Sequence, residues 1–261
     1  MFFVDTHVHW THDKLWPAHA WIEKAQQAQV AYMMTICLSS KDLNRAMELQ
    51  QSYSSVGIVA ALHPADVYGQ DDLFWEEVQQ YAKTAKLKAV GETGLDLFHQ
   101  DVPLEEQRRR FILHLELALL CQLPVVVHAR EALPLVLEIL DQHYLSDRQA
   151  RRGVIHCFGG GIEEYKEITK RGWCVGIGGC VTFKRSNALR ECVRILDPSS
   201  YVLETDAPYL SPEPDRRRVN QSGYLPEIAK FVALLRDETV EKVAEDTTKN
   251  AIALFDLKEI T

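Results

Sequence analysis

Several patterns that mark common classes of protein are missing from this sequence. No apolar stretch is long enough to cross a lipid bilayer. Asp5, His7 and His9 interrupt the N-terminal segment, so it does not resemble a signal peptide, and we expect a cytoplasmic protein with no membrane contact. The six cysteines form no C-x-x-C pair and lie mostly in apolar runs, which predicts buried, reduced thiols. Neither a G-x-S-x-G nucleophile motif nor a Walker-type phosphate loop is present.

Positive charge is also in short supply. The chain has 29 Lys and Arg against 37 Asp and Glu, which gives a formal net charge of −8. This balance opposes long-range attraction to nucleic acid. It does not exclude a nuclease, because a local cluster of cations or a bound metal ion can still attract phosphate.

What the chain does contain is a regular alternation of apolar runs and amphipathic stretches over 261 residues. Eight runs are continuously apolar and rich in β-branched residues, as in parallel strands buried on both faces. We expect these strands at Phe2–His7, Val30–Leu38, Val56–Leu62, Leu87–Gly91, Pro124–His128, Gly153–His156, Trp173–Ile177 and Tyr201–Glu204. The amphipathic stretches predict helices at Ala18–Gln29, Asp42–Ser52, Asp72–Ala85, Leu104–Leu120, Ala132–His143, Ile162–Lys170, Asn187–Leu196, Pro226–Arg236 and Val240–Phe255.

Eight strand–helix repeats favour an α/β protein built as a TIM (β/α)8 barrel, with one domain spanning residues 1–261. A doubly wound open sheet is the alternative, but the glycine-rich loop typical of its first strand is absent. The segment Ser211–Gly223, rich in Pro and Arg, is the one long irregular stretch. We expect it to lie over the barrel mouth, where the C-terminal ends of the strands form the active site.

Two histidines and an aspartate are expected to meet at one side of this mouth. His7 and His9 are two residues apart on the first strand, so their side chains point to the same face. Asp206 follows the last strand, which neighbours the first strand in a closed barrel. Imidazole and carboxylate groups are ligands for divalent metal ions, so the three side chains can share one ion.

Three further side chains end the central strands. Glu92 follows the fourth expected strand, and its two oxygens can bridge two cations. His128 and His156 end the fifth and sixth strands, each after a run of valine or isoleucine. We therefore expect a site for two divalent ions, either Mg²⁺, Mn²⁺, Zn²⁺ or Ni²⁺. The expected ligands are His7, His9, Glu92 and Asp206 for one ion and Glu92, His128 and His156 for the other.

Such a pair of ions supports hydrolysis without a covalent enzyme intermediate. Two ions about 3.5–4 Å apart can activate a bridging water and stabilise the oxygens of a displacement. Asp206 could accept the proton of that water as the catalytic base, while Glu92 holds the two ions together.

Five motifs in this chain resemble the signatures of one known family, the TatD metal-dependent deoxyribonucleases of the amidohydrolase superfamily. The resemblance runs in order from residue 2 to about residue 255. It implies a TIM barrel, divalent-metal hydrolysis of DNA phosphodiesters, and metal-ligand roles for the same six residues. The motifs are Phe3-Val4-Asp5-Thr6-His7-Val8-His9, Val90-Gly91-Glu92-Thr93-Gly94-Leu95-Asp96, His128-Ala129-Arg130-Glu131-Ala132, His156-Cys157-Phe158-Gly159-Gly160 and Glu204-Thr205-Asp206-Ala207-Pro208-Tyr209-Leu210.

The residues expected to contact substrate surround these ligands. The resemblance implies that His63, in a His-Pro pair, could hydrogen-bond substrate or phosphate. Arg130 follows His128 by two residues, and Arg216 lies in the expected mouth loop, where a guanidinium could bind phosphate. Asn220 keeps the family pattern in that loop, but Gln221 stands where the family commonly has Glu. The remaining histidines match no ligand position, and we expect them on the surface or in helices: His12, His19, His99, His114 and His143.

Two aromatic residues, Trp10 and Phe98, follow ligand motifs. Each could either stack on a nucleobase or pack at the barrel rim.

The main hypothesis is a monomeric metal-dependent phosphodiesterase that cleaves DNA from an end, without an obligate protein partner. A hydrolase of another ester or amide is the alternative, because one barrel hosts many substrates and Ser211–Gly223 departs from the family pattern. A non-catalytic metal-binding protein is a third reading, which the six-residue ligand set disfavours.

Overall fold

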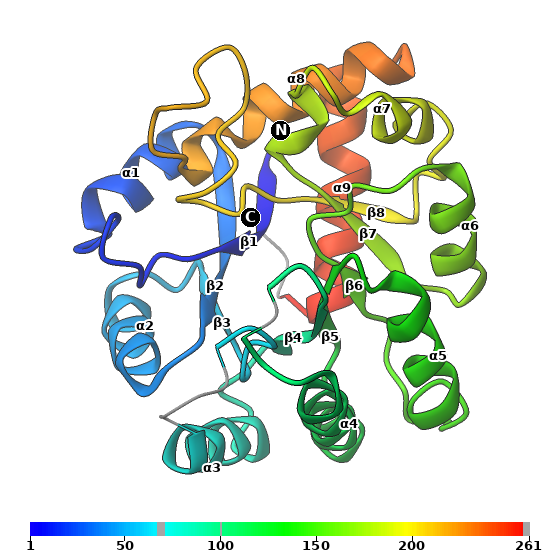
Figure 1. Ribbon diagram of the computed structural model, residues 1–261. Helices are drawn as coiled ribbons and strands as arrows, with labels where there is room; N and C mark the ends of the chain where they lie inside the picture. Colours follow the sequence, from blue (N-terminus) through cyan, green and yellow to red (C-terminus); the bar gives the residue numbers. More distant parts are fainter. Residues whose placement is uncertain (67–70, 100, 258–261) are drawn as a thin grey trace.

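The fold is a closed barrel of parallel strands, seen in a computed structural model that describes residues 1–66, 71–99 and 101–257 (Figure 1). The strands pair side by side in chain order. A parallel bridge between Val8 and Ala207 joins the last strand to the first. The expected TIM barrel is confirmed, and the open-sheet alternative is wrong. The strands are β1 (Phe3–Val8), β2 (Val30–Cys37), β3 (Val56–Ala60), β4 (Ala89–Asp96), β5 (Val125–Arg130), β6 (Val154–Ile155), β7 (Cys174–Ile177) and β8 (Tyr201–Leu203).

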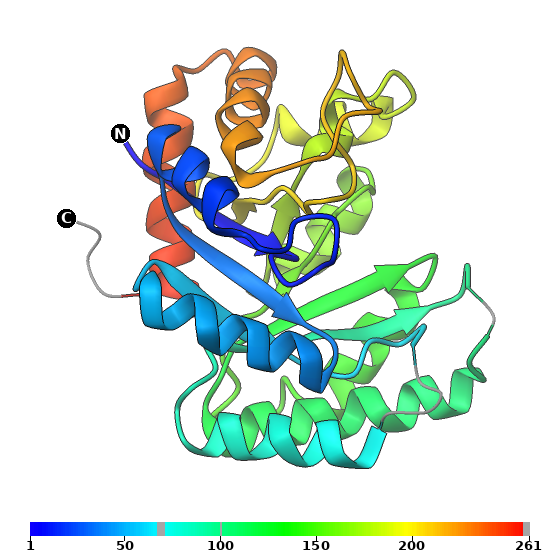
Figure 2. The same cartoon turned by 90° about the vertical axis from the view of Figure 1, so that its left-hand side faces the viewer.

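Helices cover the outside of the barrel, as the ring around the strands in Figures 1 and 2 shows. Their bounds are α1 (His19–Gln27), α2 (Ser40–Ser52), α3 (Asp71–Lys83), α4 (Leu104–Cys121), α5 (Leu133–His143), α6 (Ile162–Lys170), α7 (Asn187–Val193), α8 (Leu225–Arg236) and α9 (Val240–Phe255). Two short 3-10 helices also occur, η1 (Gly179–Thr182) and η2 (Ser222–Tyr224). No helix in the described ranges is long and apolar enough to cross a membrane.

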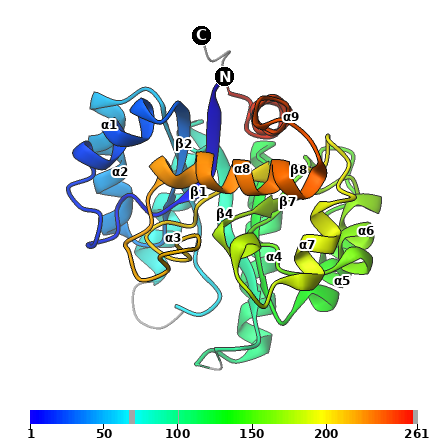
Figure 3. The same cartoon turned by 90° about the horizontal axis from the view of Figure 1, so that it is seen from above.

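The barrel interior is filled by alternate residues of the strands and closed at one end by α9. Every strand contributes to one inner cluster, from Val4 on β1 to Val202 on β8. Leu254 and Phe255, at the end of α9, belong to the same cluster. Figure 3 shows α9 end-on beside the N-terminus of β1. The opposite end, where the strands finish, is therefore the end that can hold a site.

Several elements differ from their expected bounds, and the differences concern the barrel mouth. β4 continues to Asp96 and β5 to Arg130, whereas β6 has only two residues and ends before His156. The reason is that polar residues continue these strands, and an apolar pattern cannot reveal such a continuation. The cysteines follow the expectation in part. All six are free thiols, but only three of them are buried: Cys37, Cys174 and Cys192.

The irregular segment 211–223 is held down by buried polar contacts. Asn220 donates hydrogen bonds from Nδ2 to the carbonyl of Thr205 at 2.7 Å and to that of Tyr209 at 2.6 Å. Ser222 Oγ donates to the buried carboxyl of Asp5 at 2.5 Å. These bonds join the loop to β1 and to the end of β8, which fixes one wall of the barrel mouth.

Candidate metal centre

Glu92 lies at the centre of the barrel mouth, with imidazole nitrogens on several sides of its carboxylate. Its Oε2 atom lies 3.2 Å from Nε2 of His7. Its Oε1 atom lies 2.7 Å from Nδ1 of His128 and 3.1 Å from Nε2 of His156. Nε2 of His63 is also near Oε1, at 3.5 Å. Oε2 thus faces His7, whereas Oε1 faces His63, His128 and His156, so the two oxygens are presented to different imidazoles, as in a carboxylate that bridges two cations.

An irregularity in the strand pairing places Glu92 there. Gly91 pairs with Val126 and Thr93 pairs with Val127, so Glu92 is an extra residue on β4. Such a bulge turns the extra side chain away from the regular alternation. Gly91 is needed beside it, because a Cβ atom at this position would lie 2.6 Å from both Cβ and O of Val126.

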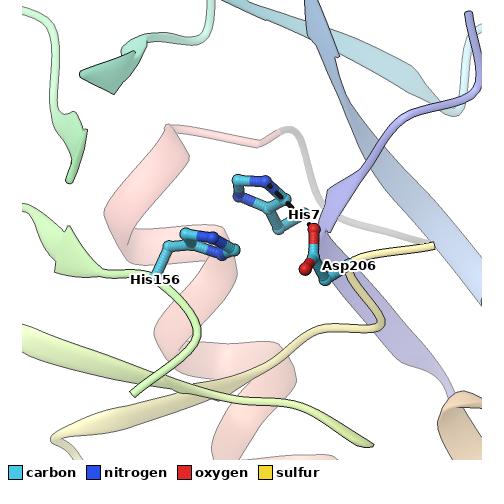
Figure 4. Close-up of side chains that lie close together, drawn as sticks. All are labelled: His7, His156 and Asp206. Carbon is cyan, nitrogen blue, oxygen red and sulfur yellow. Dashed lines mark ion pairs between the residues drawn. The ribbon is translucent and has the colours of Figure 1, made fainter. Parts of the chain in front are cut away.

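Asp206 approaches the same centre from the end of β8. Its Oδ1 atom lies 3.3 Å from Nε2 of His9 and 3.7 Å from Nε2 of His7. The backbone of Asp206 has a positive φ of 56° and donates a 2.8 Å hydrogen bond to the carbonyl of His7. Figure 4 shows Asp206 and His7 beside His156, whose ring stacks on that of His7 with 3.7 Å between centroids.

The imidazoles control the ionisation of both carboxyl groups. Burial would raise the pKa of Glu92, but the positive potential of His156, His63 and His7 outweighs burial and holds the pKa well below its usual value. Burial opposes ionisation of Asp206 as well, yet the hydrogen bond from His9 and the nearby imidazoles lower its pKa. Both side chains are therefore carboxylates at neutral pH, the form that binds cations.

Two further buried carboxyl groups lie behind the histidines. Glu204 Oε1 is 3.2 Å from Nδ1 of His156, and Asp96 Oδ2 is 3.0 Å from Nε2 of His128. In each case the other ring nitrogen faces Oε1 of the central glutamate. A carboxylate in this position fixes the orientation of a ligand histidine and increases its basicity. Sequence reasoning assigned no role to these acids, although both stand in motifs that contain an expected ligand.

The donor groups fall into three overlapping sets rather than the two expected. In each set the ligand atoms lie within 4.8 Å of one another. The sets are His7, His156 and Asp206; His7, His9 and Glu92; and His63, Glu92 and His128. The expected division grouped His156 with His128, whereas the structure stacks it on His7, with its ring centroid 6.2 Å from that of His128. His63 takes the place beside His128 that sequence reasoning did not foresee.

The residues present fit divalent metal ions. His7 is fully buried, yet within the described residues neither of its ring nitrogens has a hydrogen-bond partner. Its contact with Glu92 is close in distance but lacks hydrogen-bond geometry. A buried polar atom without a partner is costly, and a cation would satisfy it. Imidazole and carboxylate together suit Mn²⁺, Zn²⁺ or Ni²⁺, and the carboxylates also suit Mg²⁺.

His63 is held in one orientation by its own loop and by a neighbouring helix. Its Nδ1 accepts a hydrogen bond from the backbone N–H of Ala65 at 3.2 Å, so the neutral ring carries its proton on Nε2. The preceding residue, Leu62, donates its N–H to Nε2 of His114 at 3.0 Å. His114 in turn donates from Nδ1 to the carbonyl of Arg110 at 2.6 Å. This buried histidine, expected only as a surface or helix residue, therefore anchors the end of β3.

The other expected substrate residues have different environments. Arg130 lines the mouth cavity, with its guanidinium 4.4 Å from the ring centroid of Phe98. Arg216 is exposed but packs 3.7 Å over the ring of Phe183, outside the residues that line the cavity. Asn220 is fully buried, and its amide bonds to backbone carbonyls. We correct its expected role from substrate contact to loop support.

The centre opens into a cavity of about 1550 Å³. The wall includes His9, Glu92 and Asp206, and also Tyr209, which is 45% exposed. Pockets for small ligands are commonly about 300–1,000 Å³, so this cavity can admit part of a larger molecule. Trp10 does not line this cavity, because its side chain is fully buried. Of its two expected roles, packing at the barrel rim is therefore the one that the structure supports, and stacking on a nucleobase is not.

A TIM barrel that gathers imidazoles and carboxylates at its mouth is the architecture of a metal-dependent hydrolase. The chain matches the family described as "TatD related DNase" over residues 4–256, and it belongs to that family. It is 31% identical over 236 residues to the uncharacterized metal-dependent hydrolase YabD of Bacillus subtilis, covering 90% of this chain and 91% of the relative.

Solved structures share the fold of this chain. The crystal structure of YjjV, a TatD homolog from Escherichia coli K12, aligns with a TM-score of 0.91 at 28% identity and covers 98% of each chain. A TatD family hydrolase from Entamoeba histolytica shares the fold, with a TM-score of 0.82 at 18% identity over 98% of each chain.

Proposed function

We propose that this protein hydrolyses phosphodiester bonds of DNA from a chain end, using two divalent metal ions. The observation that carries the proposal is the position of Glu92 in the cavity wall, with one oxygen beside His7 and the other beside His128 and His156. When bound, the two ions would activate a water molecule and neutralise the oxygens of the reacting phosphate. Family membership supports the chemistry of a metal-dependent hydrolase.

The chain's own residues supply proton transfer and orientation. Asp206 is ionised at neutral pH and partly exposed to the cavity, so it can accept a proton from the attacking water. The Nε2–H group of His63 points toward Glu92 and can donate a hydrogen bond to a phosphate oxygen placed there. Arg130, on the cavity wall, offers a guanidinium to a second phosphate oxygen.

An ester or amide other than DNA is the second candidate, and one observation favours it. Part of the cavity wall is acidic, with five carboxyl groups outside the metal centre, apart from Asp96 beside His128: Asp42, Asp66, Asp101, Glu131 and Glu164. These groups repel a polyanion and tolerate a neutral or cationic substrate. DNA remains the first candidate because the motifs and the central carboxylate agree, and because these five acidic residues follow β2 to β6 and leave the segments after β7 and β8 free of them.

The test is a matrix of metals and substrates on purified protein that has been stripped by a chelator and reloaded. Mg²⁺, Mn²⁺, Zn²⁺ and Ni²⁺ are each tested with end-labelled DNA, a small phosphodiester, a carboxyl ester and a cyclic amide. We expect mononucleotides from end-labelled DNA and loss of that activity in His128→Ala. The matched control is His143→Ala, at the exposed end of α5.

Three other outcomes would contradict the proposal. Equal DNA cleavage by His128→Ala and the parent protein would identify a contaminating nuclease. Turnover restricted to the carboxyl ester or the amide would establish the second candidate. Stoichiometric metal without turnover on any substrate would indicate a binding protein.

A further inference from the structure

Charge is distributed unevenly around the barrel mouth. The five acidic residues of the cavity wall outside the metal centre follow β2 to β6, with Asp42 in α2 and Glu164 in α6. In contrast, residues 179–190, which follow β7, include Lys184, Arg185 and Arg190 and no acidic residue. The loop after β8 adds Arg216 and Arg217. One side of the mouth therefore repels anions and the other attracts them, although the whole chain has a net charge of −8.

The loops after β7 and β8 pack together and form one surface. The backbone N–H of Glu213 donates to Oγ1 of Thr182 at 2.9 Å. The guanidinium of Arg216 covers the ring of Phe183 at 3.7 Å. Figure 2 shows the two loops, yellow-green and gold, side by side above the strands. We define the basic rim as the four exposed cations on this surface, Lys184, Arg185, Arg216 and Arg217.

These four cations are available to bind a ligand. None of them forms an ion pair with a carboxylate in the part of the chain that the structure describes. Two neighbouring arginines are already engaged, because Arg190 donates to the carbonyls of η1 and Arg218 pairs with Glu227 at 2.5 Å. The acidic residues in these loops are Glu213 and Asp215, so the rim keeps an excess of positive charge.

Tyr209 lies between the metal centre and the basic rim. Its side chain lines the cavity, and its backbone N–H donates to the carbonyl of Asp206 at 2.9 Å. The next residue, Leu210, is in backbone contact with the β7 loop, where a Cβ atom on Gly179 would lie 2.1 Å from its carbonyl oxygen. An exposed aromatic ring held this firmly is a platform on which a nucleobase can stack.

We propose that the basic rim binds the sugar–phosphate backbone of a single-stranded nucleic acid whose end lies at the metal centre. The strand leaves the centre past Tyr209 and crosses the loops that follow β7 and β8, away from the acidic wall. This inference rests on the proposed function, because it adds a path for the uncleaved part of the substrate. A small ester would need neither the platform nor the rim.

The test is the salt dependence of binding to a phosphorothioate oligothymidylate, which resists cleavage, measured by fluorescence anisotropy. The variant combines Lys184→Gln, Arg185→Gln and Arg217→Gln, and keeps Arg216 because its contact with Phe183 joins the two loops. Each lost phosphate contact on a single strand lowers the slope of log K against log salt by about 0.7, so we expect a decrease of about 2. The matched control removes three exposed cations from the other end of the barrel: Lys83→Gln, Arg148→Gln and Lys170→Gln.

The control variant has the same net charge as the rim variant, so it should keep the slope of the parent protein. An unchanged slope in the rim variant, or equal decreases in both variants, would overturn the proposal. Failure of the proposed function would look different. In that case the slope of log K against log salt would still decrease in the rim variant, while the reloaded protein would cleave no DNA with any of the metals.

Discussion

His7 and His156 stack with 3.7 Å between their ring centroids, although His7 lies on β1 and His156 directly follows β6, which is not a neighbour of β1 in the barrel. The stack is possible because both rings point inward over the filled core of the barrel. It places two imidazoles and the carboxylate of Glu92 within direct reach of one another. The metal centre is thus one connected cluster, and substitutions in it have effects that can be separated by measuring metal content, affinity and turnover independently.

Replacement of the central carboxylate should change the number of ions that are bound. Glu92→Gln keeps the size of the side chain but removes its charge and one of its two acceptor oxygens. We expect bound metal, measured by elemental analysis after dialysis, to fall from two ions per chain to one or fewer, with turnover reduced at least about 100-fold. Glu131→Gln, on the acidic wall of the same cavity, is the control and should keep both ions. Full occupancy in Glu92→Gln would disprove a bridging role.

The proposed base should affect turnover more than binding. Asp206→Asn removes the group that accepts the proton but keeps the side-chain shape, and loss of a general base typically costs about 10²–10⁴-fold in rate. We expect kcat to fall by that amount while KM changes little, as measured with saturating metal. A variant that regained full kcat as metal concentration rose would show that Asp206 only binds metal.

The carboxyl group behind His156 should act through that histidine. Glu204→Gln leaves a group of the same size 3.2 Å from Nδ1 but cannot hold the imidazole with a negative charge. Removal of such a partner typically weakens metal binding about 10–100-fold, and calorimetric titration of the stripped protein with Mn²⁺ or Zn²⁺ measures this directly. We expect kcat at saturating metal to stay near that of the parent protein. Unchanged affinity would contradict the role assigned here.

The anchor at the end of β3 makes stability depend on pH. Burial is the main cause that lowers the pKa of His114 from 6.5 to about 4. Because the unfolded chain takes up this proton first, the contribution is present above pH 6.5 and is lost as pH falls toward 4. A pKa shift of this size changes the free energy of unfolding by about 3 kcal/mol. The side chain in His114→Gln can bond to Leu62 and Arg110 but does not titrate. Between pH 7.5 and 4.5, denaturant titrations should therefore show a smaller fall in the free energy of unfolding for this variant than for the parent protein, by about that amount.

The revised role of Asn220 has its own test. Asn220→Ala leaves two buried carbonyls without their donor, which should lower the free energy of unfolding by about 1–3 kcal/mol. Asn187→Ala, at the exposed start of α7, is the control and should change it by less than about 0.5 kcal/mol. A higher KM without any loss of stability would restore the substrate contact that the sequence suggested.

Much of the fold follows from local patterns. Buried parallel strands are continuously apolar, so runs such as Val125-Val126-Val127 can be recognised without a partner strand. Parallel strands also end on one side of a barrel, which is why His7, His128 and Asp206 could be assigned to one site. The position of Glu92 could not be derived in this way, because its bulge exists only through the pairing of β4 with β5.

Side chains whose role depends on a distant partner were missed or misassigned. Glu204 and Asp96 contact ligand histidines that are 48 and 32 residues away in the sequence. His63 lies beside Glu92 because His114, on α4, fixes the residue before it. Asn220 has the polarity of a substrate residue, yet the loop turns it inward to bond with Thr205 and Tyr209.

The amino-acid sequence by itself indicated the eight strands, the end of the barrel that holds the candidate site and the six expected metal ligands. All of these depend on short-range patterns of apolar and polar side chains. Only the tertiary structure decided which atoms meet: His156 against His7, His63 beside Glu92, and the basic rim formed by two separate loops. These contacts depend on strand register and loop packing, which arise between segments that are far apart in the chain.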